Sequence, residues 1–109
     1  MTTRKEQREA EEQSLELQEK IIAFVAAFYR IDTGEIKRKT RVLRIVAPRQ
    51  VAVYLLRDLT GLSWPCIGSI FGFDHSTGIH AYQKIERKRS ADARLNGEIQ
   101  EITDAIQGD

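Results

Sequence analysis

Apolar residues recur at helical spacing along most of the chain. In the first such segment they lie one, three or four residues apart, which places their side chains on one face of a helix. These positions are Leu17, Ile21, Phe24, Val25 and Phe28. The pattern predicts a long first helix that ends between Ile31 and Gly34. Residues 1–14 are polar and charged without an apolar stripe, which predicts either a disordered N-terminal extension or a frayed continuation of the helix.

Two further helices are predicted in the middle of the chain. An apolar segment from Val51 to Leu59 ends at Gly61 and follows Pro48, a residue that is tolerated in the first turn of a helix. We expect this second helix to be the most deeply buried. Ser63 is a suitable N-cap for a short third helix over residues 64–71.

The fourth predicted helix begins at Asp74 and continues to about Lys88. Only Gly72 and Phe73 separate it from the third helix, and two helices joined by so short a turn predict a helix-turn-helix. A last helix is indicated by apolar residues that step by four, three and four positions, namely Leu95, Ile99, Ile102 and Ile106. Since no segment shows the alternation of a strand, the predicted fold is an all-α compact helical bundle, with residues 15–109 as one domain.

Composition limits the class of protein. A chain of 109 residues can bury one core without disulfides or metals. The single cysteine, Cys66, cannot form an internal disulfide, so a reducing cytoplasm is the expected compartment. The polar start lacks the apolar core of a secretory signal, and no apolar run approaches the roughly 20 residues that span a bilayer. We therefore expect a soluble protein with no membrane partner.

The net charge of +1 hides an uneven distribution. Residues 28–89 hold twelve basic and five acidic side chains, against four and six in residues 1–27 and one and five in residues 90–109. A basic middle between acidic ends is typical of a nucleic-acid-binding core. A solvated basic surface would show the same distribution, so charge alone leaves both explanations open.

Short hydrogen-bonding side chains crowd the start of the fourth helix. In a helix-turn-helix the second helix enters the major groove amino end first, which assigns residues 74–77 to the groove. An aspartate at the start of a helix is more often a plain N-cap than a base contact. Asp74 could do both, since one carboxylate oxygen can cap the helix while the other accepts from a cytosine amino group. Thr77 and His80 share a helix face, so both can follow one phosphate backbone.

The basic loop, predicted over residues 37–44, has the sequence KRKTRVLR and carries five positive charges. Arginine favours a narrow A·T-rich minor groove, where the potential is most negative. One arginine of the loop could therefore read groove shape while the helix reads bases.

Several of these segments together resemble a known family. They are Pro48-Arg49-Gln50-Val51-Ala52, Leu59-Thr60, Ile67-Gly68, Phe71-Gly72, Asp74-His75-Ser76-Thr77, His80-Ala81 and Lys84-Ile85-Glu86. The set resembles the carboxy-terminal DNA-binding domain (domain IV) of the bacterial replication initiator DnaA, over residues from about Ile21 to about Ile106. The resemblance implies a Trp-repressor-like helix-turn-helix fold and double-stranded DNA as the partner.

The resemblance also implies roles for individual residues. It assigns base contacts to Asp74, His75 and Ser76, and phosphate contacts to Thr77 and His80. It assigns a contact with thymine methyls to Pro65, for which a purely structural role at the helix start is an equally good explanation. The remaining basic candidates are Arg41 in the minor groove, with Lys39, Arg44, Arg49 and Arg57 as phosphate contacts. Arg49 has a second interpretation, in which it orients the loop.

The sequence departs from the family pattern at three places. Ser76 replaces the commoner threonine, and the turn before Asp74 is one residue shorter than in many relatives. Gly78 replaces an apolar residue, and glycine within a helix costs about 1 kcal/mol relative to alanine. We therefore expect binding to DnaA-box-like sites without assuming that the box is unchanged.

Other functional classes fit less well. Asp74, His75 and Ser76 are adjacent and cannot form a catalytic relay, while His75 and His80 lie about 140° apart around a helix, a poor arrangement for zinc. We expect no enzyme activity, no small-molecule substrate, no cofactor and no metal. The family's ATPase domain has no counterpart in this sequence, because no phosphate-binding G-x-x-x-x-G-K-[ST] motif is present.

The biological role stays open at this stage. The first 14 residues, which include four glutamates and two glutamines, do not resemble an interdomain linker. They favour a free-standing bacterial, nucleoid-associated relative over a piece of an initiator. Such a relative would regulate replication initiation or transcription. The alternative is a protein-interaction module, in which the first helix with its charged extension pairs with a partner and modulates the initiator without binding DNA.

Overall fold

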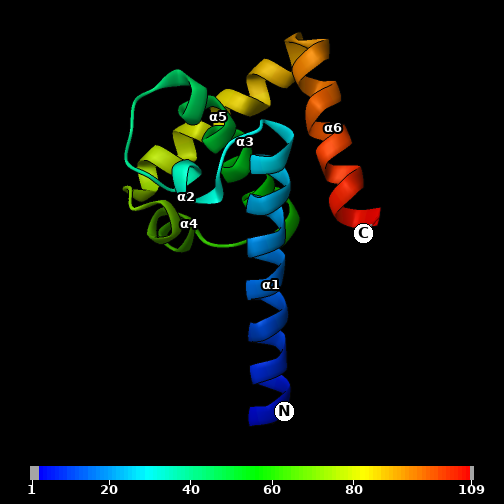
Figure 1. The fold of residues 1–109 in the computed structure, drawn as a ribbon. Coiled ribbons are helices and arrows are strands. Elements are labelled where there is room, and N and C mark those ends of the chain that lie inside the picture. Colours follow the sequence, from blue (N-terminus) through cyan, green and yellow to red (C-terminus); the bar gives the residue numbers. More distant parts are fainter. Residues whose placement is uncertain (1–2, 109) are drawn as a thin grey trace.

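The computed structural model describes residues 3–108, and every regular element in that range is a helix (Figure 1). The helices are α1 (Arg4–Phe28), α2 (Thr33–Ile36), α3 (Leu43–Thr60), α4 (Trp64–Phe71), α5 (His75–Ala91) and α6 (Ala93–Gly108). The all-α helical bundle that the apolar periodicity predicts is thus confirmed.

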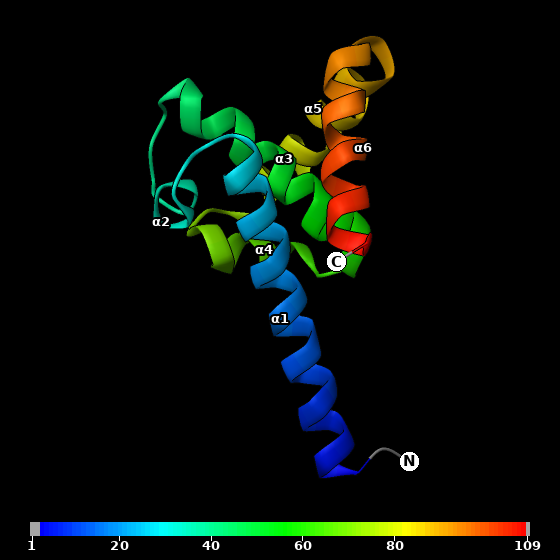
Figure 2. The ribbon, with the colours of Figure 1, turned by 45° about the vertical axis from the view of Figure 1, so that its right-hand side comes forward.

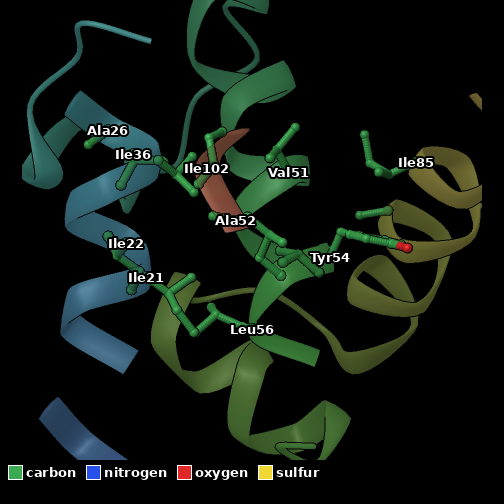
Figure 3. Packing of buried hydrophobic residues seen from close by; sticks show 14 of the residues in the cluster. Ile21, Ile22, Ala26, Ile36, Val51, Ala52, Tyr54, Leu56, Ile85 and Ile102 are labelled. Atoms are coloured by element: carbon green, nitrogen blue, oxygen red, sulfur yellow. The ribbon is translucent and has the colours of Figure 1, made fainter. Parts of the chain in front are cut away.

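The core is organised around α3, which lies between α1 on one side and α5 on the other (Figure 3). Eight residues of α3 are buried, more than in any other helix of the described range, as expected for the second predicted helix. The three isoleucines of the last apolar stripe, Ile99, Ile102 and Ile106, are buried as well. They hold α6 against α1 and α5.

The first half of α1 projects from the bundle as a straight stem, which both views show (Figures 1 and 2). Residues 3–16 are exposed, and the helix begins with a capping box in which Thr3 and Glu6 bond each other's backbone N–H groups. From Leu17 onward the apolar stripe turns into the core. The described part of the N-terminal extension is therefore continuous with the first helix.

The end of the first helix differs from the prediction. The helix ends at Phe28, and α2 follows after a turn in which Arg30 has a φ of 57°. Asp32 and Glu35 form a second capping box around α2 and fix its start. With four residues, α2 is too short to show an apolar period, which is why the pattern did not reveal it.

The predicted start of the second helix is also wrong. The helix begins at Leu43, so Pro48 lies inside it and removes one backbone hydrogen bond. The extra turn before the proline is held by Ile45, which is buried in the core. Arg44 consequently belongs to the first turn of α3, which leaves residues 37–42 as the basic loop.

Candidate nucleic-acid interface

The turn between α4 and α5 is fixed by a close backbone approach. Ser63 caps α4 as predicted, and the helix ends at Gly72, whose φ of 70° is accessible to glycine without strain. The N–H of Phe73 then donates to the carbonyl of Gly68 at 3.0 Å. A Cβ atom on Gly68 would lie 2.5 Å from the carbonyl oxygen of Phe73, so only glycine fits this approach.

Asp74 caps α5 and is itself held in place. Its Oδ1 accepts hydrogen bonds from the backbone N–H of Ser76 at 2.9 Å and from the Ser76 hydroxyl at 3.1 Å. These two bonds, and to a smaller extent nearby His75, hold the pKa of the carboxyl below its usual value. Among the described residues Oδ2 has no hydrogen-bond donor, which leaves it able to accept from an outside group.

The start of α5 presents its polar side chains to solvent. Residues 74–77 and His80 are exposed, while Gly78, Ala81 and Ile85 of the same helix are buried. A Cβ atom on Gly78 would lie 3.3 Å from the ring of Phe73 and 3.4 Å from that of Trp64. The glycine thus lets α5 pack closely on these rings.

The basic loop lies beside the start of α5, and the two enclose a groove of about 700 Å³, the loop–helix groove. Its apolar lining comes from α3, α4, α5 and the turn: Val46, Val53, Phe71, Phe73 and Ala81. Its polar lining holds four cations, Lys39, Arg41, Arg49 and Lys84, together with Thr40, Gln50, Thr77 and His80. The fold therefore brings residues of the loop and residues of the helix, more than thirty positions apart in sequence, to one hollow.

Arg49 ties the basic loop to α3. Its guanidinium donates to the backbone carbonyls of Arg38 at 2.7 Å and Thr40 at 2.6 Å, and its partial burial lowers its pKa. A planar guanidinium can serve two acceptors at once. Of the two roles that the sequence left open, these contacts match orientation of the loop.

Six predicted residues lie outside the lining of the groove: Asp74, His75 and Ser76 at the start of α5, together with Arg44, Arg57 and Pro65. Arg44 forms an exposed ion pair with Glu35 at 2.9 Å. Arg57 donates to the carbonyl of Leu62 at 2.7 Å and stacks over the ring of Trp64 at 4.7 Å. Pro65 is exposed in the first turn of α4.

Lys84 lines the groove as well, although it is not among the contacts that the sequence predicts. It lies four residues after His80 and seven after Thr77 on α5, and so on the same helix face. This spacing could have identified Lys84 as a third member of that face.

Residues 3–108 contain no group of three or more histidine, cysteine, aspartate or glutamate side chains that could hold a metal ion. No helix within this range is both long enough and apolar enough to cross a membrane.

A three-residue turn between α4 and α5, an exposed polar start on α5 and a cationic loop beside it place the chain in the helix-turn-helix class. The family model for the bacterial DnaA protein helix-turn-helix matches residues 18–85. The chain belongs to this family, which supports DNA binding as its general function.

Curated relatives agree with the family model. The chain is 46% identical over 84 residues to the chromosomal replication initiator protein DnaA of Limosilactobacillus fermentum, an alignment that covers 76% of this chain and 19% of the relative. It is 43% identical over 91 residues to the protein of the same name from Burkholderia multivorans, with 83% and 17% covered. The chain thus spans about a fifth of the length of the curated relatives it matches.

Proposed function

We propose that this chain binds double-stranded DNA sequence-specifically, at sites related to the box of the replication initiator. In this proposal the start of α5 enters the major groove and the basic loop reaches the adjacent minor groove. The observation that carries it is the loop–helix groove, which has Arg41 on one wall and Thr77 and His80 on the other.

The lining of this groove suits one sugar-phosphate strand. Adjacent major and minor grooves of a duplex are separated by a single backbone strand, so elements that read both must pass on either side of it. Lys39 and Arg41 supply positive charge from the loop, and Thr77, His80 and Lys84 supply donors from α5. Arg41 is then able to extend past the strand toward the minor-groove floor, where the negative potential attracts it.

Base reading is assigned to the exposed residues that open α5. Oδ1 of Asp74 is held by Ser76, so Oδ2 is oriented to accept from a base amino group, for which cytosine N4 is the partner in the major groove. The Ser76 hydroxyl donates to Asp74, and its oxygen is left to accept. His75 is exposed beside them. Its Nδ1 lies 3.5 Å from Oδ1 of Asp74, which leaves Nε2 to donate to a base edge or accept from one.

The remaining predicted contacts extend the same surface. Arg57 retains N–H groups beyond the one bonded to Leu62, which suits a phosphate on the α4 side, and Pro65 offers an exposed apolar ring there. Arg44 would have to exchange Glu35 for a phosphate. We further propose that occupancy of such sites regulates replication initiation or transcription, since a chain bound to initiator boxes would compete with an initiator for them.

A gel-shift titration tests the proposal, with an initiator-box duplex compared against a scrambled duplex of equal composition at two salt concentrations. We expect tighter binding to the box. With five to seven neutralised phosphates, affinity should fall with salt at a log-log slope of about −4.5 to −6.3. Arg41→Ala should weaken binding, whereas Arg8→Ala, which removes the same charge from the exposed stem of α1, should not.

Equal affinity for the two duplexes would rule out sequence-specific reading, and a salt-independent association would rule out the phosphate contacts. Insensitivity to Arg41→Ala and His75→Ala, together with retained binding to an initiator protein, would favour the protein-interaction alternative.

A further inference from the structure

Two large apolar side chains are exposed at the end of the basic loop. Leu43 is 79% exposed and Val42 is 56% exposed, and the sequence places them between Arg41 and Arg44. In the described part of the chain the only other large apolar side chain so exposed is Leu15, on the stem of α1. Large exposed apolar patches rimmed by polar residues mark interaction sites, and this pair is a small apolar surface flanked by cations.

The position of Leu43 on α3 connects it to the loop–helix groove. Val46, Gln50 and Val53 line the groove, and they follow Leu43 at three, seven and ten residues, so all four lie on one face of α3. Leu43 occupies the first position of the helix. It is not itself part of the groove lining, but it lies on the same helix face one turn before Val46 and two residues from Arg41.

The minor groove offers an apolar surface that depends on sequence. Its walls are deoxyribose rings, and its floor carries the guanine N2 amino group at G·C pairs but no such group at A·T pairs. Proteins that bind the minor groove use apolar side chains in this setting together with arginine. A leucine beside a groove-reading arginine would therefore pack closely at A·T pairs and be held off at G·C pairs.

We propose that Leu43, assisted by Val42, is a specificity-determining residue that packs into the minor groove beside Arg41 and selects against the guanine amino group. This inference rests on the proposed function, because it requires the basic loop to lie in the minor groove. In this arrangement Arg41 responds to the width of the minor groove through its electrostatic potential, and Leu43 responds to the presence or absence of the guanine amino group.

The same pair between cations would also suit insertion into an anionic bilayer. DNA is favoured because Arg41 lines one hollow with Thr77 and His80. A concave, cationic surface fits a phosphate strand, whereas a flat bilayer would contact only its rim. Binding to vesicles is therefore an outcome of the test.

The experiment uses the full chain and base analogues that separate the two grooves. Hydroxyl-radical footprinting first locates the A·T pairs that the protein protects on the minor-groove side. At those pairs, three duplexes are compared by fluorescence anisotropy: A·T, G·C and inosine·cytosine. Inosine·cytosine has the major-groove edge of G·C but lacks the N2 amino group, as A·T does.

We expect the parent protein to bind the A·T and inosine·cytosine duplexes with similar affinity. The G·C duplex should bind about five- to tenfold more weakly, because the amino group keeps the leucine side chain partly in water. Leu43→Ala should reduce that discrimination to less than about twofold. Leu43→Lys should raise affinity for all three duplexes without restoring the discrimination. Leu15→Ala, the matched truncation of an exposed leucine on the stem, should change nothing.

Unchanged discrimination in Leu43→Ala overturns the inference, as does a parent protein that treats inosine·cytosine like G·C. If the parent protein sediments with anionic vesicles, and Leu43→Ala abolishes this sedimentation but keeps the discrimination between duplexes, then Val42 and Leu43 bind a membrane instead. These failures leave the proposed function intact if the box is still preferred over the scrambled duplex. If neither duplex is preferred, the proposed function itself has failed.

Discussion

Replacing Gly68 with alanine should destabilise the helix-turn-helix, because the glycine has no room for a side chain. The added Cβ would lie 2.5 Å from the carbonyl oxygen of Phe73, about 0.9 Å closer than an ordinary contact. The obstacle is backbone, so the turn has to open and the 3.0 Å bond from the N–H of Phe73 to Gly68 is weakened. Overpacking of this kind costs about 1–3 kcal/mol. The weakened hydrogen bond costs roughly 1 kcal/mol, and the higher helix propensity of alanine gains roughly the same amount. These last two contributions cancel, so the overpacking cost decides the net effect.

Gly97→Ala is the matched control. Gly97 lies within α6, and its added Cβ would meet nothing within 4 Å. The same chemical change should therefore contribute only the propensity of alanine and stabilise the protein by about 1 kcal/mol.

Thermal unfolding followed by circular dichroism measures both variants. For a domain of this size a change of 1 kcal/mol moves the Tm by about 4–8 °C. Gly97→Ala should raise the Tm by that amount, and Gly68→Ala should lower it by an equal or larger amount. Since the turn positions α5, Gly68→Ala should also weaken binding to an initiator-box duplex at temperatures where it is folded. If both variants raise the Tm equally, the close approach between Gly68 and Phe73 does not exist.

Substitutions at three further residues test single contacts. Arg49→Lys should accelerate amide hydrogen exchange in residues 38–42 and weaken DNA binding about tenfold, because an ammonium cannot serve both loop carbonyls as the guanidinium does; unchanged exchange would contradict this. His75→Ala should cost about 1–3 kcal/mol on the box duplex and spare the scrambled one, whereas equal losses would exclude base reading. Asp74→Ala should lower the Tm at neutral pH. Because the folded pKa of Asp74 is lowered, the charge of the cap stabilises above the unfolded pKa and its contribution is lost as the pH falls through the folded value. The Tm difference should therefore shrink in acid to what a neutral cap contributes. Asp74→Asn, which is such a neutral cap, should lower the Tm less than Asp74→Ala; an Asp74→Ala difference independent of pH would refute the linkage.

The sequence was most informative where structure is set by neighbours in the chain. Ser63 and Asp74 were identified as caps, and Gly72 as the end of α4, because capping depends on side chains within three residues. The start of α3 was mispredicted for the opposite reason. Pro48 is commonest in a first turn, and only the burial of Ile45 in the tertiary core explains why the helix begins a turn earlier.

The loop–helix groove could not be predicted from the sequence. Composition and resemblance assigned cations to the basic loop, but their distance from α5 depends on how α3 carries the loop past the helix. Arg49 illustrates the difficulty, since its two acceptors are backbone carbonyls that any residue would offer. The exposed Leu43 is equally hidden in the pattern, where it reads as one more apolar residue near a helix start.

The two walls of the groove, α5 and the basic loop, are held in place by separate contacts within the protein. The position of α5 is set by the close approach at Gly68 and by the packing of Gly78 on Phe73, while the basic loop is held by Arg49. Neither set of contacts involves DNA. A duplex would therefore meet two walls already at their working separation, and less binding free energy would be lost to ordering the loop. On this argument Arg49→Lys should weaken binding chiefly through that ordering cost, so its effect should be similar on the box and the scrambled duplex, unlike the effect of His75→Ala.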